Sequence, residues 1–533
     1  MLPESAPIWP SVAAPRYQGT RRFIEPGAVV ATKFVVSLAV LWSGFRSVSD
    51  DDFARVTIAQ SFAWHPSLDP SGTSWLPLPF WVYGGAMTLF GPSLATARVT
   101  ALCLGMAGAL AVWFAARAIG MQRPAALVGA ILAACIPHSA VYGTATVPDY
   151  PTAVLALYAS VTLASKRVPI RLVGAAAVCL ATLCRYETWP IAAVLVACAI
   201  IDAIRDRTNR VAYGVAAALA PSGAIAWMLH GSWQHGDALF FLKRVSAYRR
   251  ALGGPSLHAT TRLLKVPTSI AFGEPEITVL LLLALAAIFA ASRRKMRENH
   301  PNGPGSAHTW LRPGLAFSSL VAFLTLGNWL DGAPTHHEDR TLLSLWLGMA
   351  LFAGELTTRL VFGTARAAGV TGAPGTAIAP ARVENASVTG DSHSSAFRWI
   401  TLSVVVTLTL AAAESRSRLV EYEPYVDRSR ELCIGHIARE RLTPDVKVAI
   451  YTEDFGYFAV LSALARPNAW PISRHDPRDK LDHVMQNAEA LRAKLDELQA
   501  HYVVMPKARR SNLPAASQVI AEACDFLLAR LEN

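Results

Sequence analysis

Charged residues are scarce in this chain. Only 16% of its 533 residues are Asp, Glu, Lys or Arg, whereas 53% are hydrophobic. Soluble domains carry about 25% charged residues, and a chain of this length is too long to fold around one hydrophobic core. The scarcity of charge therefore excludes a single soluble domain and indicates a polytopic membrane protein.

Long stretches lack charge altogether, and residues 99–116 are one example. Because a helix of about 20 apolar residues crosses a bilayer, we predict about eleven crossings. The predicted spans are 29–47, 94–116, 125–143, 150–164, 171–185, 187–204, 211–230, 276–292, 313–330, 341–361 and 397–413. The fold class that follows is a polytopic α-helical membrane protein.

Lysine and arginine are nearly absent from the short loops on one side of these spans. We place the N-terminus, with Arg21 and Arg22, in the cytoplasm, because the basic residues then fall in the inside loops, where they resist translocation. Those inside clusters lie at 117–123, 166–171, 205–210 and 293–297. The pattern predicts a multi-pass protein of the cytoplasmic (inner) membrane, with residues 414–533 on the extracytoplasmic side.

Composition also divides the chain into segments. Residues 1–28 are polar and Pro-rich without the pattern of a cleaved signal peptide, so we expect a cytoplasmic N-terminal segment. Residues 362–396 are rich in Gly, Pro and Ser and have no periodicity, which predicts a flexible cytoplasmic linker. The predicted transmembrane module covers 29–361, its outer loops are 48–93, 143–149 and 231–274, and the last span is 397–413.

The composition changes again in residues 414–533. They contain 17 basic and 18 acidic residues, so the net charge of +11 resides in the membrane part. That excess is an orientation signal, and we expect no nucleic-acid partner. Residues 446–452 and 501–506 have the pattern of strands, and 455–465 and 480–500 that of helices. The sequence therefore predicts a small extracytoplasmic α/β domain.

Cysteine is rare, with 7 in the whole chain, and five of these fall in predicted spans, where a small apolar thiol is ordinary. Cys433 and Cys524 are the two in the C-terminal domain. Since an exported domain meets an oxidising compartment, we predict a disulfide between them.

One outer loop breaks the charge pattern. The segment 231–274 contains Lys243, Arg244, Arg249, Arg250, Arg262 and Lys265. Basic residues on this side oppose the orientation of the spans, so another role should favour them. The groups either bind an anionic ligand such as a phosphate, or they contact lipid headgroups at the outer surface or are simply solvated.

Acidic residues mark the other two outer loops. Asp50, Asp51 and Asp52 follow the first span directly, and Asp149 is the single charged residue of the second loop. A carboxylate at an apolar boundary is costly unless it is solvated, paired or functional, so the two loops could converge over one cavity. The alternative is helix capping, which needs one Asp in each loop. We expect Asp50 to be the cap in the first loop.

At these residues the sequence resembles the GT-C glycosyltransferases, in the branch of the protein O-mannosyltransferases and lipid A aminoarabinose transferases. The resemblance covers most of residues 29–361 and rests on motifs that are each weak alone. The matching positions are Asp51 and Asp52, then Pro79, Trp81, Tyr83, Phe90 and Gly91, then Arg98, Pro148, Asp149, the segment 184–190, His337 and Arg340. Asp52 and Thr341 stand where the family often has Glu and Tyr, so the sugar is not indicated.

The resemblance implies an inverting transfer of a sugar from a polyprenyl-phosphate donor to a glycan, lipid or protein acceptor at the outer face of the membrane. Such a transfer needs a carboxylate as general base and cations on the departing phosphate. The implied catalytic residues are Asp51, as the base, with Asp52 and Asp149. The implied substrate- and phosphate-binding residues are Arg340, Lys243, Arg244, Arg249, Arg250, Arg185 and His337. No cofactor is certain, although Asp51 and Asp52 could hold a divalent cation.

Several of these residues have a simpler interpretation. Arg340 could snorkel to the membrane boundary, and Arg185 could form an ion pair with Glu187. His336 and His337 are adjacent, and without a spaced third ligand they suit a loop cap better than a metal site.

Two other classes of function stay open. A flippase or secondary transporter would move lipid-linked or anionic substrates, but such proteins commonly show internal repeats and charges at mid-membrane. This chain has no clear repeat, and its candidate charges lie at the ends of spans. The other class is a non-catalytic scaffold whose exported domain binds a partner.

Overall fold

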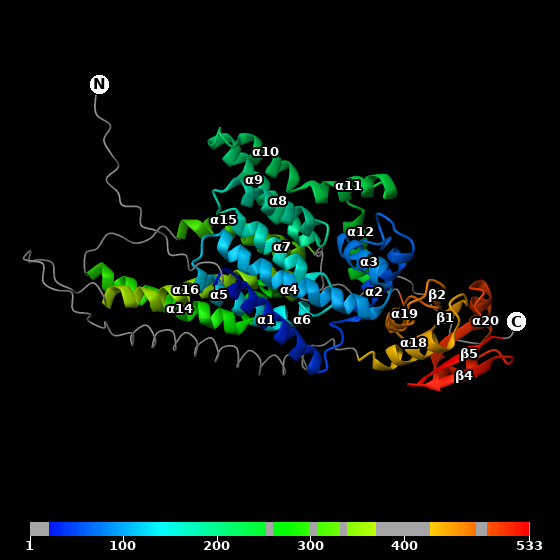
Figure 1. The fold of residues 1–533 in the computed structure, drawn as a ribbon. Coiled ribbons are helices and arrows are strands. Elements are labelled where there is room, and N and C mark those ends of the chain that lie inside the picture. The colour runs from blue at the N-terminus through cyan, green and yellow to red at the C-terminus, as the bar shows by residue number, and fades with distance from the viewer. Residues whose placement is uncertain are drawn as a thin grey trace, which may run out of the picture.

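The computed structural model describes residues 21–251, 259–297, 307–330, 338–368, 427–475 and 488–531. Within these residues the chain forms a large helical body, which is followed by a small α/β domain (Figure 1). The predicted last span 397–413, His337, and residues 1–20 and 369–396 of the predicted cytoplasmic segments lie outside the described residues.

The helical body begins with α1 (Arg21–Trp42), α2 (Asp50–Trp64), α3 (Leu78–Phe90), α4 (Leu94–Ala118), α5 (Arg123–Cys135), α6 (Pro137–Tyr142), α7 (Asp149–Thr162) and α8 (Val168–Thr182). It continues with the 3-10 helix η1 (Tyr186–Thr188), α9 (Trp189–Arg205), α10 (Arg210–Leu219), α11 (Ser222–His235), α12 (Phe240–Ala251), α13 (Ala259–Phe272), α14 (Pro275–Arg297), α15 (Ala307–Trp329) and α16 (Glu338–Ala368).

Several of these helices can cross a membrane. Five among the described residues are long and apolar enough: Phe23–Trp42, Leu94–Ala118, Tyr186–Arg205, Trp310–Trp329 and Arg340–Thr358. Two bent pairs would raise the number to 7 if each is one span: Arg210–Leu219 with Ser222–His235, and Thr260–Phe272 with Pro275–Ala286. The chain is therefore a multi-pass membrane protein, and the count of about eleven spans stays a prediction.

The structure differs from the predicted elements in a few places. The predicted span 125–143 is interrupted after Cys135, because Pro137 has no N–H to continue the hydrogen bonds of α5 and begins α6 instead. The segments 48–93 and 231–274, predicted as outer loops, are largely helical, as α2, α3, α12 and α13. Residues 362–368, assigned to the linker from the sequence, continue α16.

Small residues let the central helices of the body approach closely. A Cβ atom on Gly354 of α16 would lie 2.5 Å from the nitrogen of Gly129 on α5, and a Cβ atom on Gly129 would lie 2.9 Å from the Cα of Leu351. Close backbone contact of this kind is how helices associate in a bilayer. It buries the side chains around it, and Trp346 and Leu347 of α16 are fully enclosed.

The C-terminal domain is built around a sheet of five strands in the order β2-β1-β3-β5-β4. Its elements are α18 (Ser429–Arg441), β1 (Val448–Ile450), α19 (Tyr457–Leu464), β2 (Ala469–Pro471), α20 (Ala488–Glu497), β3 (Tyr502–Pro506), the 3-10 helix η2 (Lys507–Asn512), β4 (Gln518–Ala523) and β5 (Phe526–Arg530). Strand β1 is parallel to β2 and β3, whereas β5 is antiparallel to β3 and β4.

Each face of this sheet carries its own apolar cluster, because side chains alternate along a strand. Val504 of β3 packs with Ile434 of α18 and Val460 of α19, while the next residue, Met505, packs with Leu491 of α20 on the other face. The predicted strands and helices of an α/β domain are present. The predicted disulfide is also confirmed, since Cys433 of α18 is bonded to Cys524 beside β5.

The C-terminal domain contacts the helical body at α2. Gln60 of α2 donates a hydrogen bond of 2.9 Å to the carbonyl oxygen of Ser462 in α19, and Ala459 of α19 packs with Phe53 and Val56 of α2. Figure 1 shows α19 beside α2 at the end of the body. The helix that begins with the three aspartates therefore lies between the body and the C-terminal domain.

Candidate active site

The backbone before α2 is fixed by Asp52. Its Oδ2 accepts hydrogen bonds from the backbone N–H groups of Val48 and Ser49, at 2.9 and 3.2 Å. Its Oδ1 accepts from the N–H and the hydroxyl of Thr146 in the second outer loop, both at 3.0 Å. Burial raises the pKa of the Asp52 carboxyl, and these backbone donors act in the opposite direction. Asp52 therefore links the predicted first and second outer loops, although Asp52 and Asp149 line different cavities.

The prediction that Asp50 is the cap is wrong. Ser49 occupies the N-cap position of α2, and Asp52, three residues later, completes a capping box with it. Asp50 instead points to the C-terminal domain, where its two oxygens accept hydrogen bonds from the guanidinium of Arg428, each at 2.8 Å. Asp50 and Asp52 thus have different surroundings, although they are only two positions apart.

Asp51 faces Arg340, which lies in the first turn of α16. Their closest side-chain atoms, Asp51 Oδ2 and Arg340 Nη1, are 3.3 Å apart. Arg340 also donates a hydrogen bond of 3.1 Å to the hydroxyl of Ser49. The Arg340 side chain is only 5% exposed, whereas that of Asp51 is 42% exposed. A buried, paired Arg340 does not fit the snorkelling interpretation, and an exposed Asp51 can be reached by another molecule.

Asp149 and Arg185 form a second pair. Arg185 Nη1 donates to Asp149 Oδ1 at 2.5 Å, and its Nε pairs with Glu187. The ion pair of Arg185 with Glu187 is therefore present, but it does not exclude a contact with the acidic loop. Asp149 is buried in the first turn of α7, and its Oδ2 has no hydrogen-bond partner among the described residues.

Arg55 completes this cluster, and the sequence analysis missed it. Its guanidinium carbon lies 4.4 Å from the centre of the Trp75 ring, which is cation–π distance. Burial lowers the pKa of the Arg55 guanidinium, and the nearby carboxylates of Asp51 and Asp149 counteract this effect. The signal was present, because Arg55 follows Asp51 by four residues and the two share one face of α2.

Asp51 and Asp149 are thus surrounded by three guanidinium groups, those of Arg55, Arg185 and Arg340, which we call the Asp–Arg cluster. Asp149, Arg185 and Arg340 line one small cavity together, with Thr341 and Ser344 of α16. Because carboxylates and guanidinium groups converge there, the cluster can both accept a proton and bind a phosphate.

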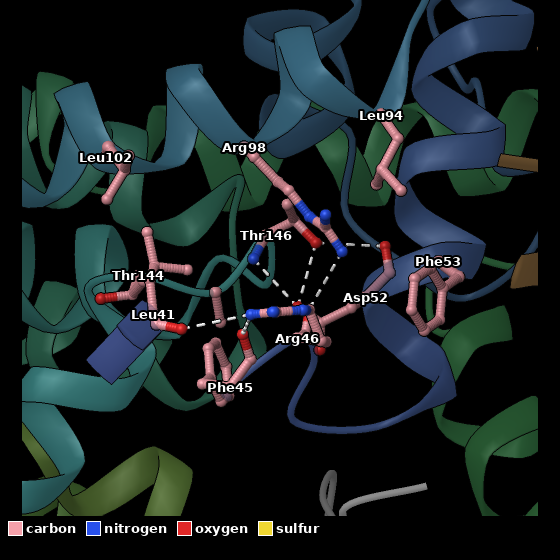
Figure 2. A pocket seen from close by; sticks show the side chains of 11 residues that line it. Leu41, Phe45, Arg46, Asp52, Phe53, Leu94, Arg98, Leu102, Thr144 and Thr146 are labelled. Atoms are coloured by element: carbon pink, nitrogen blue, oxygen red, sulfur yellow. Dashed lines mark hydrogen bonds between the residues drawn. The ribbon is translucent and has the colours of Figure 1, made fainter. Parts of the chain in front are cut away.

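A second cavity, of about 50 Å³, is lined by Asp52 (Figure 2). Arg46 and Arg98 reach into it, and Arg98 donates a long hydrogen bond of 3.5 Å to the carbonyl oxygen of Arg46. The remaining lining is mostly aliphatic and aromatic, from Leu41, Phe45, Phe53, Leu94 and Leu102. The cavity borders α1 and α4.

The basic outer segment does not join the Asp–Arg cluster in the part of the chain that the structure describes. Lys243 is 81% exposed and pairs with Asp237 at 2.6 Å. Arg244 donates a hydrogen bond of 3.3 Å to the carbonyl oxygen of Gly72, and Arg250 is exposed. The side chain of Arg249 and residue His337 are outside the described parts.

The proposed cation ligands Asp51 and Asp52 are a poor pair for a metal. Both oxygens of Asp52 accept hydrogen bonds from Val48, Ser49 and Thr146, and Asp51 contacts a guanidinium. A metal at this place would have to displace these donors.

Comparison with known proteins adds to this geometry. Residues 66–228 match the family described as dolichyl-phosphate-mannose-protein mannosyltransferase. No curated protein matches the sequence.

Two solved structures of ArnT from Cupriavidus metallidurans are similar to the chain. One, bound to undecaprenyl phosphate, has a TM-score of 0.58 and 14% sequence identity over 96% of this chain and 98% of that one. The other, in the apo state, has a TM-score of 0.56 and 15% identity over the same shares. At these identities the likeness shows a common fold. Residues 66–228 are thus similar to that mannosyltransferase family, and the chain has an ArnT-like fold, which agrees with the resemblance to the GT-C glycosyltransferases.

Proposed function

We propose that the protein is a membrane glycosyltransferase that takes a sugar from a polyprenyl-phosphate donor and transfers it to a hydroxyl acceptor at the outer face of the cytoplasmic membrane. The observation that carries the proposal is the Asp–Arg cluster, above all the contact of Asp51 with Arg340 at 3.3 Å. The family match over residues 66–228 and the ArnT-like fold favour the same class of reaction.

Asp51 is the proposed general base. It removes the proton from the acceptor hydroxyl while the hydroxyl oxygen attacks the anomeric carbon. The bond between that carbon and the phosphate oxygen breaks, the polyprenyl phosphate leaves with the electron pair, and the configuration inverts. The side chain of Asp51 is 42% exposed, so an acceptor can reach it, whereas Asp52 and Asp149 are buried.

The guanidinium groups of the cluster are proposed to hold the donor phosphate. Arg340 and Arg55 both lie near Asp51, so a phosphate between them would place the anomeric carbon close to the base. Guanidinium groups suit this role because their planar donors match phosphate oxygens. Lys243, Arg244 and Arg250 are exposed or partly exposed, and we propose that they contact the donor or the lipid headgroups next to it.

Asp52 and Asp149 act as positioning residues in this proposal. Asp52 holds the two outer loops together through Thr146. Asp149 holds Arg185, which in turn pairs with Glu187.

The donor class is taken from the similarity to ArnT, whose structure was solved bound to undecaprenyl phosphate. The sugar and the acceptor are not indicated by any of these contacts.

One observation favours a transporter, the second candidate function. Lys33 lies in the middle of the candidate span Phe23–Trp42 and is fully buried, and an ionisable residue at such a depth often marks a transport pathway. However, its ammonium donates to the carbonyl oxygen of Ser139 at 2.5 Å and lies 4.4 Å from the centre of the Tyr150 ring. These contacts explain Lys33 as a link between helices, so we favour the enzyme.

The proposed location can be tested separately from the chemistry. A reporter that is active only in the cytoplasm, fused after the C-terminal residue, should be silent if the C-terminal domain is extracytoplasmic. An active reporter would contradict the proposed orientation.

The chemistry is tested with the purified full-length chain in lipid nanodiscs. The chain is incubated with a panel of polyprenyl-phosphate sugars and acceptors, and the release of polyprenyl phosphate is measured. We expect release with the wild type and its loss with Asp51→Asn, whereas Asp496→Asn, at an exposed position of α20, should behave as wild type. Equal release by the Asp51→Asn variant would refute the catalytic role, and movement of an intact lipid-linked sugar across the bilayer would favour the transporter.

A further inference from the structure

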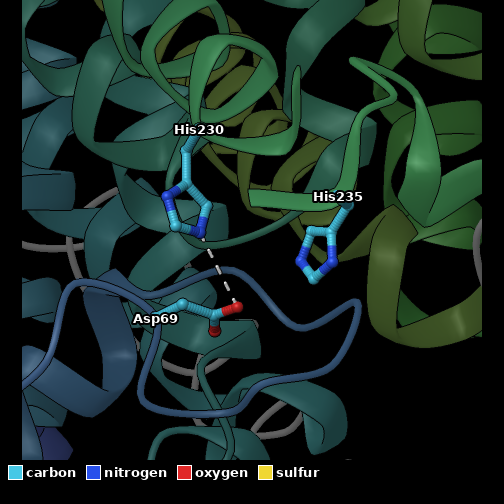
Figure 3. A group of neighbouring side chains, drawn as sticks. All are labelled: Asp69, His230 and His235. Atoms are coloured by element: carbon cyan, nitrogen blue, oxygen red, sulfur yellow. Dashed lines mark ion pairs between the residues drawn. The ribbon is translucent and has the colours of Figure 1, made fainter. Parts of the chain in front are cut away.

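We propose that Asp69, His230 and His235 bind a divalent transition metal of the zinc class, at a site separate from the Asp–Arg cluster. Figure 3 shows the three side chains converging from two segments of the chain. Asp69 lies between α2 and α3, and the two histidines lie near the end of α11. Their potential ligand atoms all lie within 4.8 Å of one another, and no other group of three or more such residues in the described parts meets this criterion.

The carboxylate of Asp69 is already oriented for this role. Its Oδ1 accepts hydrogen bonds from the Ser71 hydroxyl and the Gly72 N–H, at 3.1 and 3.0 Å. Its Oδ2 faces Nε2 of His230 at 3.9 Å. Hydrogen bonds to one oxygen of a ligating carboxylate are the usual support for metal binding through the other oxygen.

The distance between Asp69 and His230 suits a shared metal better than a direct contact. At 3.9 Å the oxygen and nitrogen are too far apart for a hydrogen bond. Zinc lies about 2.0–2.2 Å from each nitrogen and oxygen ligand, so two tetrahedral ligands are about 3.3–3.5 Å apart. Asp69 and His230 therefore need only a small closing movement to share a metal, and the ligand atom of His235 lies within 4.8 Å of both. In addition, His230 Nε2 is buried and has no hydrogen-bond partner among the described residues, and coordination would remove the cost of that orphaned group.

Aromatic neighbours hold both imidazole rings. His230 is stacked on Trp227 with 5.0 Å between the ring centres, and His235 is stacked on Phe240 at 4.1 Å. Imidazole rings whose orientation is already fixed by stacking lose less conformational entropy when they bind a ligand. Two imidazoles and one carboxylate with a free fourth position match a zinc site, whereas magnesium and calcium prefer all-oxygen sites.

Metal binding would fix the segment that carries Asp69 to the end of α11. The same segment carries Trp75, which stacks on Arg55 of the Asp–Arg cluster. The metal would thereby hold Trp75 in place. This consequence rests on the proposed function, but the metal site itself does not.

The test uses the full-length chain, purified in detergent without a polyhistidine tag and stripped of metal. Co²⁺ is the probe, because its visible absorption reports tetrahedral coordination, and Zn²⁺ is then added as competitor. We expect saturable binding of about one Co²⁺ per chain, displaced by Zn²⁺. His235→Ala and Asp69→Asn should each weaken binding about tenfold or more.

His65→Ala is the matched control, because His65 is exposed and lies outside the group; it should bind Co²⁺ as the wild type does. The metal-free melting temperatures of all variants are measured first, so that only folded proteins are compared. Absence of saturable binding in the wild type, or unchanged binding in both His235→Ala and Asp69→Asn, would overturn the site. No sugar donor enters the assay, so its result is independent of the transfer reaction.

Discussion

Asp50 and Arg428 form a two-point ion pair, with both pairs of atoms at 2.8 Å, although they are 378 positions apart in the sequence. The same guanidinium binds Glu431 and Asp454, each at 2.9 Å. Burial alone would lower the pKa of Arg428, but the carboxylates of Asp50 and Asp454 outweigh it and the pKa is raised. Because Asp51 follows Asp50 directly, the C-terminal domain holds the helix start that carries the candidate base.

We expect Arg428→Ala to destabilise the contact between the C-terminal domain and α2. Removing a largely buried cation leaves its carboxylates facing one another, which costs about 2–4 kcal/mol. The measurement is the unfolding transition of the full-length chain, together with the rate of proteolysis of the C-terminal domain.

The matched control is Arg430→Ala, two residues away. Arg430 pairs with Asp525 at the surface, where both side chains are more than two-thirds exposed, so its loss should cost less than about 1 kcal/mol. Equal effects of the two variants would show that the Asp50–Arg428 pair does not stabilise the domain contact.

Asp51→Asn should lower turnover by about two orders of magnitude or more, because the amide keeps the size of the side chain but cannot act as a base. Expression and donor binding should be nearly unchanged, and the assay is release of polyprenyl phosphate by the purified chain.

Asp50→Asn provides the comparison, and the structure changes what is expected of it. Since Asp50 is not the cap but the partner of Arg428, its variant should lose stability while the folded fraction keeps most of its turnover. If Asp50→Asn abolishes transfer and Asp51→Asn does not, the choice of base is wrong.

Arg340→Ala should mainly weaken donor binding. A phosphate held by this guanidinium is present in both the ground state and the transition state, so the loss appears in KM or Kd more than in kcat. A charge-assisted hydrogen bond contributes about 1.5–3 kcal/mol, which corresponds to an affinity loss of about 10- to 150-fold.

The binding of polyprenyl phosphate to the purified variant measures this loss. Arg340→Lys keeps the charge without the planar donors and should recover part of the affinity. Unchanged binding with a large fall in kcat would instead assign Arg340 to the orientation of Asp51.

Reduction of the Cys433–Cys524 disulfide should destabilise the C-terminal domain. The bond joins α18 to the β4–β5 turn across 91 positions of the sequence. Removing such a link increases the entropy of the unfolded chain and typically costs about 2–5 kcal/mol. Thermal unfolding with and without a thiol reductant measures the effect, and Cys433→Ser should match the reduced wild type. Insensitivity to the reductant, with both thiols shown to be free, would contradict the prediction.

Much of the fold was predictable because its causes are local. The absence of charge over about 20 residues identifies a span, and alternating apolar residues identify strands such as β3. The interruption of the predicted span 125–143 at Pro137 was missed: proline lacks the N–H that continues a helix, but α1, α13 and α15 each continue through an internal proline. The helices in the predicted outer segments were missed; among them, α2 packs against α3 and against α19 of the C-terminal domain, a contact between residues far apart in the sequence.

Some features of the candidate site are likewise local in the sequence, whereas others depend on the fold. The sequence by itself determined that carboxylates stand beside apolar runs in two connecting segments and that Arg185 and Arg340 follow them later in the chain, because both features are local. The tertiary structure alone decided which groups meet. In the fold, Asp51 contacts Arg340, which lies 289 positions later in the sequence. Asp52 accepts hydrogen bonds from the backbone before α2 and from Thr146, and Asp50 forms an ion pair with Arg428. Arg55, which stacks on Trp75, completes the cluster. Neighbouring residues at a helix start point in different directions, so their roles depend on what packs against each one, and that is set by helices and a domain distant in the sequence.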